Sequence, residues 1–288
     1  NEFESEIRIK WVNYLSQEGK WKQINPDFIK TSEGWKVIDA PFTAIAPLYS
    51  NGTTQFVSNN KYDLFNKKII TSPELTQYIT ALNVNYTEGI KEYGDLGFGE
   101  TNYIVYENAY PSIDADLIYW IHQGRAPRLN KIVRFNTKLN LDLQLQFEIS
   151  YDSKDKSKLK LKYGKNLKDW DGKNKISTNE TLTVKRQGEN QLRGISFKDF
   201  KIWDANRSKV QTIEVSIEKN KGDSYILTKF IPQQFFENAN FPVYTDTVST
   251  FLPDANPETN SVDGAVSHNS PSNDGLRTWS DMIMVSGN

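Results

Sequence analysis

The strongest constraint on the fold is the strict alternation of apolar and polar residues in "LDLQLQFEI", residues 141–149. Leu, Phe and Ile occupy every odd position, and Asp, Gln and Glu occupy every even one. This two-residue period is that of a β-strand, because a helix would turn the same apolar residues toward several sides. The segment therefore predicts an antiparallel strand with one face in a core and the other in water.

The same period recurs along the chain, in "EIRIKW" (6–11), "KLKLKY" (158–163) and "TIEVSIEK" (212–219). Turn-forming pairs such as Asn51-Gly52 and Asp171-Gly172 lie between such runs. The best helical candidate is "SPELTQYITAL" (72–82), which has a Ser-Pro start. Many short strands with regular turn signals predict an all-β protein of antiparallel β-sandwich architecture.

Composition excludes several classes of function. The chain has 35 Lys and Arg against 36 Asp and Glu, so no net field favours nucleic acid. It has no Cys, which excludes disulfides, thiolate metal sites and Cys nucleophiles. No run of 18 apolar residues is present, so we expect no membrane insertion. Lys and Asn are both abundant. A Lys–Asn isopeptide cross-link is therefore a further hypothesis, for which the sequence favours no particular pair of residues.

The distribution of charge suggests a division of the chain. Lys229 is the last lysine, and from Ile231 onward the only base is Arg277, against seven acidic residues. We therefore expect a boundary near residue 240. The predicted organisation is an N-terminal β-sandwich region over 1–100 and a second over 101–240, with one continuous sandwich as the alternative. Residues 241–288 would then begin a further module or an assembly extension.

Two stretches resemble known surface proteins. "YIVYENAYPSIDADLIYWIHQGRAPRLNKIVRFN" (103–136) resembles a β-sandwich segment of large secreted YD-repeat/Rhs-type, wall-associated or phage-derived proteins. "GKWKQINPDFIKTSEGWKVIDAPFTAIAP" (19–47) resembles the strands that precede that segment. The following positions match the pattern of the first stretch: Tyr106, Tyr110, Asp116, Leu117, Tyr119, Lys131, Ile132 and Val133.

The second resemblance begins at Phe241. "FPVYTDTVSTFLPDANPET" (241–259) resembles the opening of disaggregatase-related jelly-roll repeats, and "RTWSDMIMVSGN" (277–288) resembles a later strand of such a repeat. Together the resemblances imply a β-sandwich scaffold in a long extracellular, cell-surface or virion-associated protein, and they supply no active site.

An unfinished module would leave an open sheet edge, and open edges pair with other strands. The partners would be copies of this chain or neighbouring structural subunits. The residues expected to carry this assembly are the apolar ones of the two end strands: Phe241, Val243, Tyr244, Val248, Phe251, Trp279, Met282, Ile283, Met284 and Val285.

One loop has the composition of a calcium site, and no other cofactor is expected. "DANPETNSVDG" places five Asp, Asn or Glu side chains in ten residues, but without the spacing of an EF-hand. An ordinary polar loop explains the same letters. The candidate ligands are Asp254, Asn256, Glu258, Asn260 and Asp263.

Tryptophans near turns suggest an alternative, carbohydrate binding by stacking on sugar faces. Trp170, flanked by charges in "LKDWDG", is the one we expect to be most exposed, and Trp21 and Trp35 are further candidates. The opposing interpretation is that these side chains close the ends of a core.

A third reading, a carboxylate glycosidase, rests on Asp114 and Asp116, which a strand would place on one side. The alternative is that Asp114 caps a turn and Asp116 is solvated. The two histidines, His122 and His268, match no catalytic motif. The favoured function is non-enzymatic: a structural or assembly module of an extracellular or virion surface protein, such as a filament, fibre or decoration subunit. An adhesin or carbohydrate-binding module comes next.

Overall fold

The computed structural model describes most of the chain, and the statements below concern those residues. They are 13–15, 18, 20–23, 25–40, 42–58, 61–63, 68–70, 75–97, 100–122, 128–153, 159–164, 168–187, 192–252, 265–267 and 277–279.

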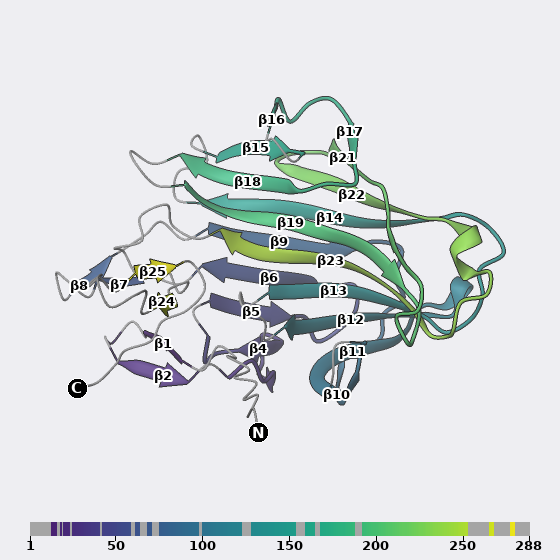
Figure 1. Cartoon of the computed structure of the whole chain (residues 1–288), viewed down its shortest axis with the longest axis horizontal. Helices are drawn as coiled ribbons and strands as arrows, with labels where there is room; N and C mark the ends of the chain where they lie inside the picture. Colours follow the sequence, from purple (N-terminus) through teal and green to yellow (C-terminus); the bar gives the residue numbers. More distant parts are fainter. Residues whose placement is uncertain are drawn as a thin grey trace, which may run out of the picture.

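Two large antiparallel sheets make up the fold, as the sequence predicts (Figure 1). The first, called sheet I here, has the order β10-β11-β12-β13-β23-β19-β18-β15-β16, and β20 pairs with β19 beside this path. Its strands are β10 (Ile90–Asp95), β11 (Glu100–Tyr110), β12 (Ala115–His122), β13 (Arg128–Phe135), β15 (Leu159–Tyr163), β16 (Lys168–Trp170), β18 (Leu182–Gln187), β19 (Leu192–Trp203), β20 (Val210–Thr212) and β23 (Val243–Leu252).

The second sheet, sheet II, has the order β17-β21-β22-β14-β9-β6-β5-β4-β3. Its strands are β3 (Ile29–Lys30), β4 (Trp35–Val37), β5 (Phe42–Ala46), β6 (Thr53–Ser58), β9 (Leu75–Ala81), β14 (Leu143–Ser153), β17 (Ile176–Thr178), β21 (Val215–Lys219) and β22 (Ser224–Ile231). Most of the strongly alternating segment 141–149 belongs to β14, which pairs with β22 and β9 at the centre of this sheet.

Smaller elements complete the described part. Three two-stranded ribbons pair β1 (Asn13–Leu15) with β2 (Trp21–Gln23), β7 (Lys61–Asp63) with β8 (Lys68–Ile70), and β24 (Ala265–Ser267) with β25 (Arg277–Trp279). The helical turns are the 3₁₀ segments η1 (Pro111–Ile113) and η3 (Gln233–Phe236). Among the described residues no helix is long and apolar enough to span a bilayer.

The sheets pack face to face around one main core. Alternate residues of each strand enter it: Leu145, Phe147 and Ile149 from β14, and Leu129, Val133 and Phe135 from β13. The side-chain period of two thus places one apolar face of each sheet against the other, which buries the apolar surface that drives folding. A smaller cluster, with Trp120, Trp203 and Tyr244, lies apart from this main core.

The helical expectation for residues 72–82 is wrong. Leu75–Ala81 form β9, an inner strand between β14 and β6. The β-branched residues of "LTQYITA" suit a pleated surface, and pairing on both sides outweighs the helix-start signal of Ser-Pro.

The predicted regions share both sheets. β9, from residues 1–100, pairs with β14, from residues 101–240, so these two regions form one continuous sandwich. The strand expected to open a separate module after residue 240 is instead β23, which pairs with β13 on one side and β19 on the other. Residues 243–252 therefore belong to the middle of sheet I.

Candidate functional site

The interior polar cluster is a group of buried polar side chains in and beside the main core. Asp246, the cross-strand partner of Ile132, lies on the face of sheet I that points away from sheet II, and the other members lie between the sheets. Sheet I supplies Lys131 from β13 and Asp246 and Ser249 from β23, and sheet II supplies Gln77, Tyr151 and Lys229 from β9, β14 and β22. Each of the six side chains is buried. Polar groups so deep in a protein are costly unless they bond one another, so their arrangement is informative.

A chain of hydrogen bonds crosses the core within this cluster. The Lys131 ammonium donates to Ser249 Oγ at 2.7 Å and to the Leu129 carbonyl at 3.2 Å. Ser249 Oγ donates to Gln77 Oε1 at 2.6 Å, and Gln77 Nε2 donates to the Tyr151 hydroxyl at 3.0 Å. The chain therefore joins β13 and β23 of sheet I to β9 and β14 of sheet II.

The other two members meet the backbone of Lys131. Asp246 Oδ1 accepts a hydrogen bond from Lys131 N at 2.9 Å, and Lys229 Nζ donates to the Lys131 carbonyl at 3.2 Å. Each lysine also lies over an aromatic ring: Lys131 Nζ is 5.0 Å from the ring centroid of Phe197, and Lys229 Nζ is 5.0 Å from that of Phe147.

Burial shifts the titration of these groups. It lowers the pKa of Lys229 to about 8, against a smaller opposing effect of Asp246. It lowers the pKa of Lys131 well below its usual value, with the neighbouring charge of Lys229 acting in the same direction and Asp246 opposing. Burial raises the pKa of Asp246, and the two lysines partly offset that rise. The cluster thus favours uncharged forms.

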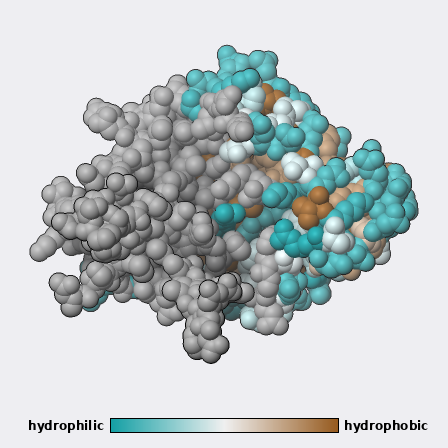
Figure 2. Space-filling view, viewed as in Figure 1, coloured by the Kyte–Doolittle hydropathy of each residue, from teal (hydrophilic) through white to brown (hydrophobic). Residues whose placement is uncertain are grey.

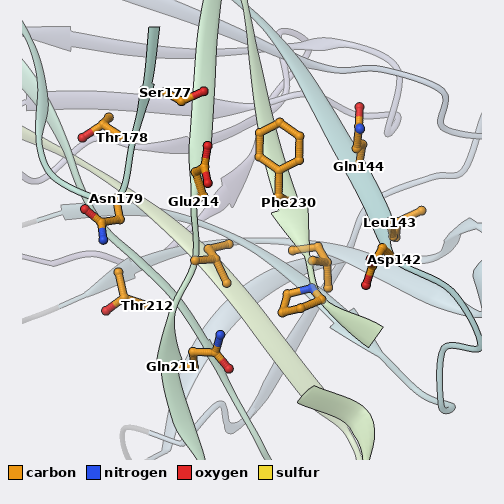
Figure 3. A pocket seen from close by; sticks show the side chains of 13 residues that line it. Asp142, Leu143, Gln144, Ser177, Thr178, Asn179, Gln211, Thr212, Glu214 and Phe230 are labelled. Carbon is orange, nitrogen blue, oxygen red and sulfur yellow. The ribbon is translucent and has the colours of Figure 1, made fainter. Parts of the chain in front are cut away.

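A second feature is an open groove of about 800 Å³ on the surface, shown in Figure 3. Phe230 lies between Glu214 and Gln144 there, and Gln144 is the cross-strand partner of Phe230. Hydroxyl and amide groups of Ser177, Thr178, Asn179, Gln211 and Thr212 line the opposite side. The groove combines one aromatic face with many hydrogen-bonding groups.

The two aspartates of the glycosidase hypothesis lie in different environments. Asp114 is an exposed turn residue with φ of 46°, and its N–H donates to the Pro111 carbonyl.

Asp116 is 3% exposed and pairs with Arg134, whose Nε lies 2.8 Å from Oδ2. It also accepts hydrogen bonds from Asn108 N at 2.6 Å and Asn136 Nδ2 at 3.1 Å. The expectation that Asp116 is solvated is wrong.

The structure describes the side chains of two of the three tryptophans predicted to bind carbohydrate, Trp170 and Trp35. Trp170 is 9% exposed, packs on Tyr225 with ring centroids 5.4 Å apart, and donates to the Asn174 carbonyl at 2.7 Å. The expectation that it is exposed is therefore wrong, since it closes one end of the core. Trp35 is partly exposed, with Lys30 Nζ 5.4 Å from its ring. Trp21 lies in β2, and its side chain is outside the described residues.

The predicted assembly residues that the structure describes lie mostly inside it. Val243, Tyr244 and Val248 are each at most 5% exposed, because β23 has a neighbour on both sides. They offer no free edge for another subunit. Phe241 precedes the strand and is 37% exposed. Phe251 belongs to β23 and Trp279 to β25, but their side chains are not described.

The remaining predicted residues are outside the described part of the chain. This holds for Met282, Ile283, Met284 and Val285, and for the five calcium candidates Asp254, Asn256, Glu258, Asn260 and Asp263. Within the described residues, no group of three or more His, Asp or Glu side chains could hold a metal ion.

The interior polar cluster was not predicted, although the sequence contains a signal for it. In "RLNKIVRF" the apolar positions Leu129, Val133 and Phe135 alternate, and Lys131 occupies the one inward position between them. Lys229 breaks the inward series of Leu227 and Ile231 in the same way. A lysine at an inward position of a core strand predicts a buried polar site.

Comparison with protein-family models, with curated proteins and with solved structures finds no match to this chain.

Proposed function

We propose that the chain is a non-enzymatic structural module that assembles with copies of itself or with neighbouring subunits. One observation carries this proposal: large apolar side chains are exposed along the side of the sandwich where β3 and β10, the edge strands of the two sheets, lie. Eight large apolar side chains are exposed in the described part of the chain, and five belong to this side. They are Ile29 (45%), Ile38 (50%), Tyr86 (67%), Ile90 (49%) and Tyr93 (70%).

Contacts between the two edges make this side one surface. Lys91 of β10 pairs with Asp27, just before β3, at 3.1 Å. Trp35 of β4 donates from Nε1 to the Gly89 carbonyl at 3.2 Å, and Lys30 pairs with Glu88 at 2.8 Å. These contacts hold sheets I and II together on this side. We call this surface the β3/β10 side.

The partner is a second copy of the chain or a subunit of similar chemistry. β10 pairs with β11 alone among the described strands, so its other side is a sheet edge that a further strand can join. Lys91 and Glu92 on the same strand carry opposite charges, which suits an antiparallel self-pairing across a two-fold axis. By contrast, the visible face in Figure 2 is mostly hydrophilic over its coloured residues.

Sedimentation velocity over a range of protein concentrations tests the proposal. We expect reversible self-association that the double change Ile90→Lys and Tyr93→Lys weakens by tenfold or more, because two buried apolar contacts are lost. Leu141→Lys is the matched control, since Leu141 is 61% exposed but lies elsewhere, before β14. A wild-type chain that stays monomeric at high concentration would contradict self-assembly.

The resemblances in the sequence extend the proposal to location. The module would belong to an extracellular, cell-surface or virion protein. Labelling of the native source with an antibody to residues 1–240 tests this. Label in regular arrays on particles or filaments is expected, and label confined to the cell interior would contradict it.

The groove of Figure 3 favours carbohydrate binding as a second candidate function. The ring of Phe230 offers an apolar face, and Gln144, Asn179 and Gln211 offer paired donors and acceptors, as sugar recognition requires. A glycan array should show saturable binding that Phe230→Ala removes and Trp170→Phe retains. Binding unchanged by Phe230→Ala would exclude this groove.

A further inference from the structure

The hydrogen-bond chain of the interior polar cluster has the components of a covalent cross-link. Ser249 supplies a hydroxyl nucleophile, Lys131 a base next to it, and Gln77 a carboxamide next to both. Ser249 Oγ lies 2.7 Å from Lys131 Nζ and 2.6 Å from Gln77 Oε1. A serine activated by an adjacent base is the usual arrangement for attack on an acyl carbon.

The amide carbon of Gln77 is within reach of that hydroxyl. Since a C=O bond is about 1.23 Å long and Oγ lies 2.6 Å from Oε1, the carbon lies less than about 4 Å from Oγ. A reactive approach needs about 3–3.5 Å, which a small rotation of the amide provides. The Tyr151 hydroxyl, 3.0 Å from Nε2, holds the other end of the amide.

Lys131 can act as the base because of where it lies. It is 1% exposed, and burial, aided by the charge of Lys229, lowers its pKa well below the usual lysine value while Asp246 opposes the shift. The neutral amine is the form that accepts a proton. Turning the Ser249 proton from Gln77 Oε1 to Lys131 Nζ requires only rotation of the hydroxyl, because both atoms are within hydrogen-bonding distance.

We propose that Ser249 and Gln77 react to form an intramolecular ester that joins the two sheets. The Oγ–Cδ bond forms as the hydroxyl proton passes to Lys131. The Cδ–Nε2 bond then breaks, and the proton held by Lys131 goes to the departing nitrogen, which leaves as ammonia. A hydroxyl and a primary amide thus become an ester and ammonia, with no oxidant or other reactant.

The site protects such a bond once it has formed. Gln77 and Ser249 are fully buried and Tyr151 is 7% exposed, so water that would hydrolyse the ester is excluded. The bond would connect β9 of sheet II to β23 of sheet I, across 172 residues of chain. It is a modification of the core, and it is independent of self-association through the β3/β10 side.

Intact-mass spectrometry of the purified full chain tests the proposal. We expect a mass lower than that of the sequence by one ammonia, and a cross-linked peptide pair that contains Gln77 and Ser249 in tandem spectra. Hydroxylamine at neutral pH under denaturing conditions should cleave the link, since it cleaves esters and leaves ordinary amides intact. Cleavage of the Asn51-Gly52 bond, which alkaline hydroxylamine also attacks, is told apart by its fragment masses. A mass equal to that of the sequence would overturn the proposal, and no variant is needed to obtain that result.

Variants identify the participating groups. Ser249→Ala should abolish the mass loss, and Lys131→Met should slow formation by about 100-fold or more, the usual contribution of a general base. Thr247→Val is the matched control, because Thr247 is equally buried on the same strand, and it should keep the link. Mass loss that persists in Ser249→Ala, or that resists hydroxylamine, would assign the link to an amide and overturn the ester.

Discussion

The two sets of buried charges in this sandwich are held in opposite ways. Asp116 and Arg134 form a direct ion pair at 2.8 Å, and both oxygens of the carboxylate accept hydrogen bonds. In the interior polar cluster, the lysines instead donate to neutral oxygens: Lys131 to Ser249 Oγ, and Lys229 to a carbonyl.

The difference shows what a buried charge needs in order to persist. Burial alone would lower the pKa of Arg134, but the bond and charge of Asp116 more than offset it, so the pKa is raised. No carboxylate of the described residues is bonded to the ammonium groups of these lysines, and their pKa values fall. Asp116 and Arg134 therefore stay charged as a structural ion pair, and the two lysines of the interior polar cluster lose their protons more readily than exposed lysines do.

The largest effect should come from breaking the ion pair. Asp116→Ala leaves Arg134 partly buried without its carboxylate and removes the acceptor for Asn108 N, so we expect a loss of about 3–5 kcal/mol in the free energy of unfolding. Urea denaturation measures it. Asp114→Asn, at an exposed turn, should change stability by less than about 0.5 kcal/mol. Equal effects of the two changes would show that burial does not distinguish them.

An intermediate effect should appear when the lysines lose their protons. The pKa of Lys229 is about 8 in the folded chain, below its value of about 10.4 in an unfolded one. The unfolded chain therefore binds more protons between these values, and stability rises with pH. From pH 8 to pH 9.5 Lys229 should contribute a rise of about 2 kcal/mol, and Lys131 acts in the same direction.

Urea denaturation of the wild type and of Lys229→Met at both pH values isolates this contribution. The variant should show the smaller rise. The measurement stops at pH 9.5 because the buried tyrosines act in the opposite direction above pH 10: burial raises the pKa of Tyr119 to about 12, so the unfolded chain loses that proton first. An identical rise in both proteins would contradict the assignment.

The smallest effect should follow from keeping the charge of the ion pair and changing its shape. Arg134→Lys retains a cation beside Asp116 but removes the planar Nε–H donor, so we expect a loss of about 1 kcal/mol. Urea midpoints at pH 7 measure it. A loss as large as that of Asp116→Ala would mean that guanidinium geometry, rather than charge, holds the carboxylate.

Local periodicity predicted the strands but not their partners. The alternation of residues 141–149 predicted β14, because side-chain direction is a property of the strand itself. The environment of Asp116 could not be predicted, since it depends on a shift of register between Tyr106 and Tyr110 in the neighbouring strand. That irregularity turns the Asn108 N–H toward the carboxylate, and no local pattern records it.

The candidate sites were harder to predict because they join distant segments. Trp170, between charges in the sequence, is covered by Tyr225 of another strand. Gln77 and Ser249 lie 172 residues apart and meet only because β9 and β23 face each other across the core. A lysine at an inward position of a strand predicts a buried polar site. The residues that it contacts there depend on the order of strands in the two sheets, which the local pattern does not contain.

The central position of β23 has a consequence for how the chain is made. β10 to β13 precede it by more than a hundred residues, and β19 also comes earlier, yet β23 is the strand that joins these two halves of sheet I. During synthesis the inner edge of each half of sheet I therefore stays unpaired until the ribosome has made residues 243–252. Long-range pairings of this kind fold slowly. The last strand to be added thus lies in the middle of sheet I. Until it pairs, the exposed edges of β13 and β19 are the places where a chaperone or the strand of another chain would bind first.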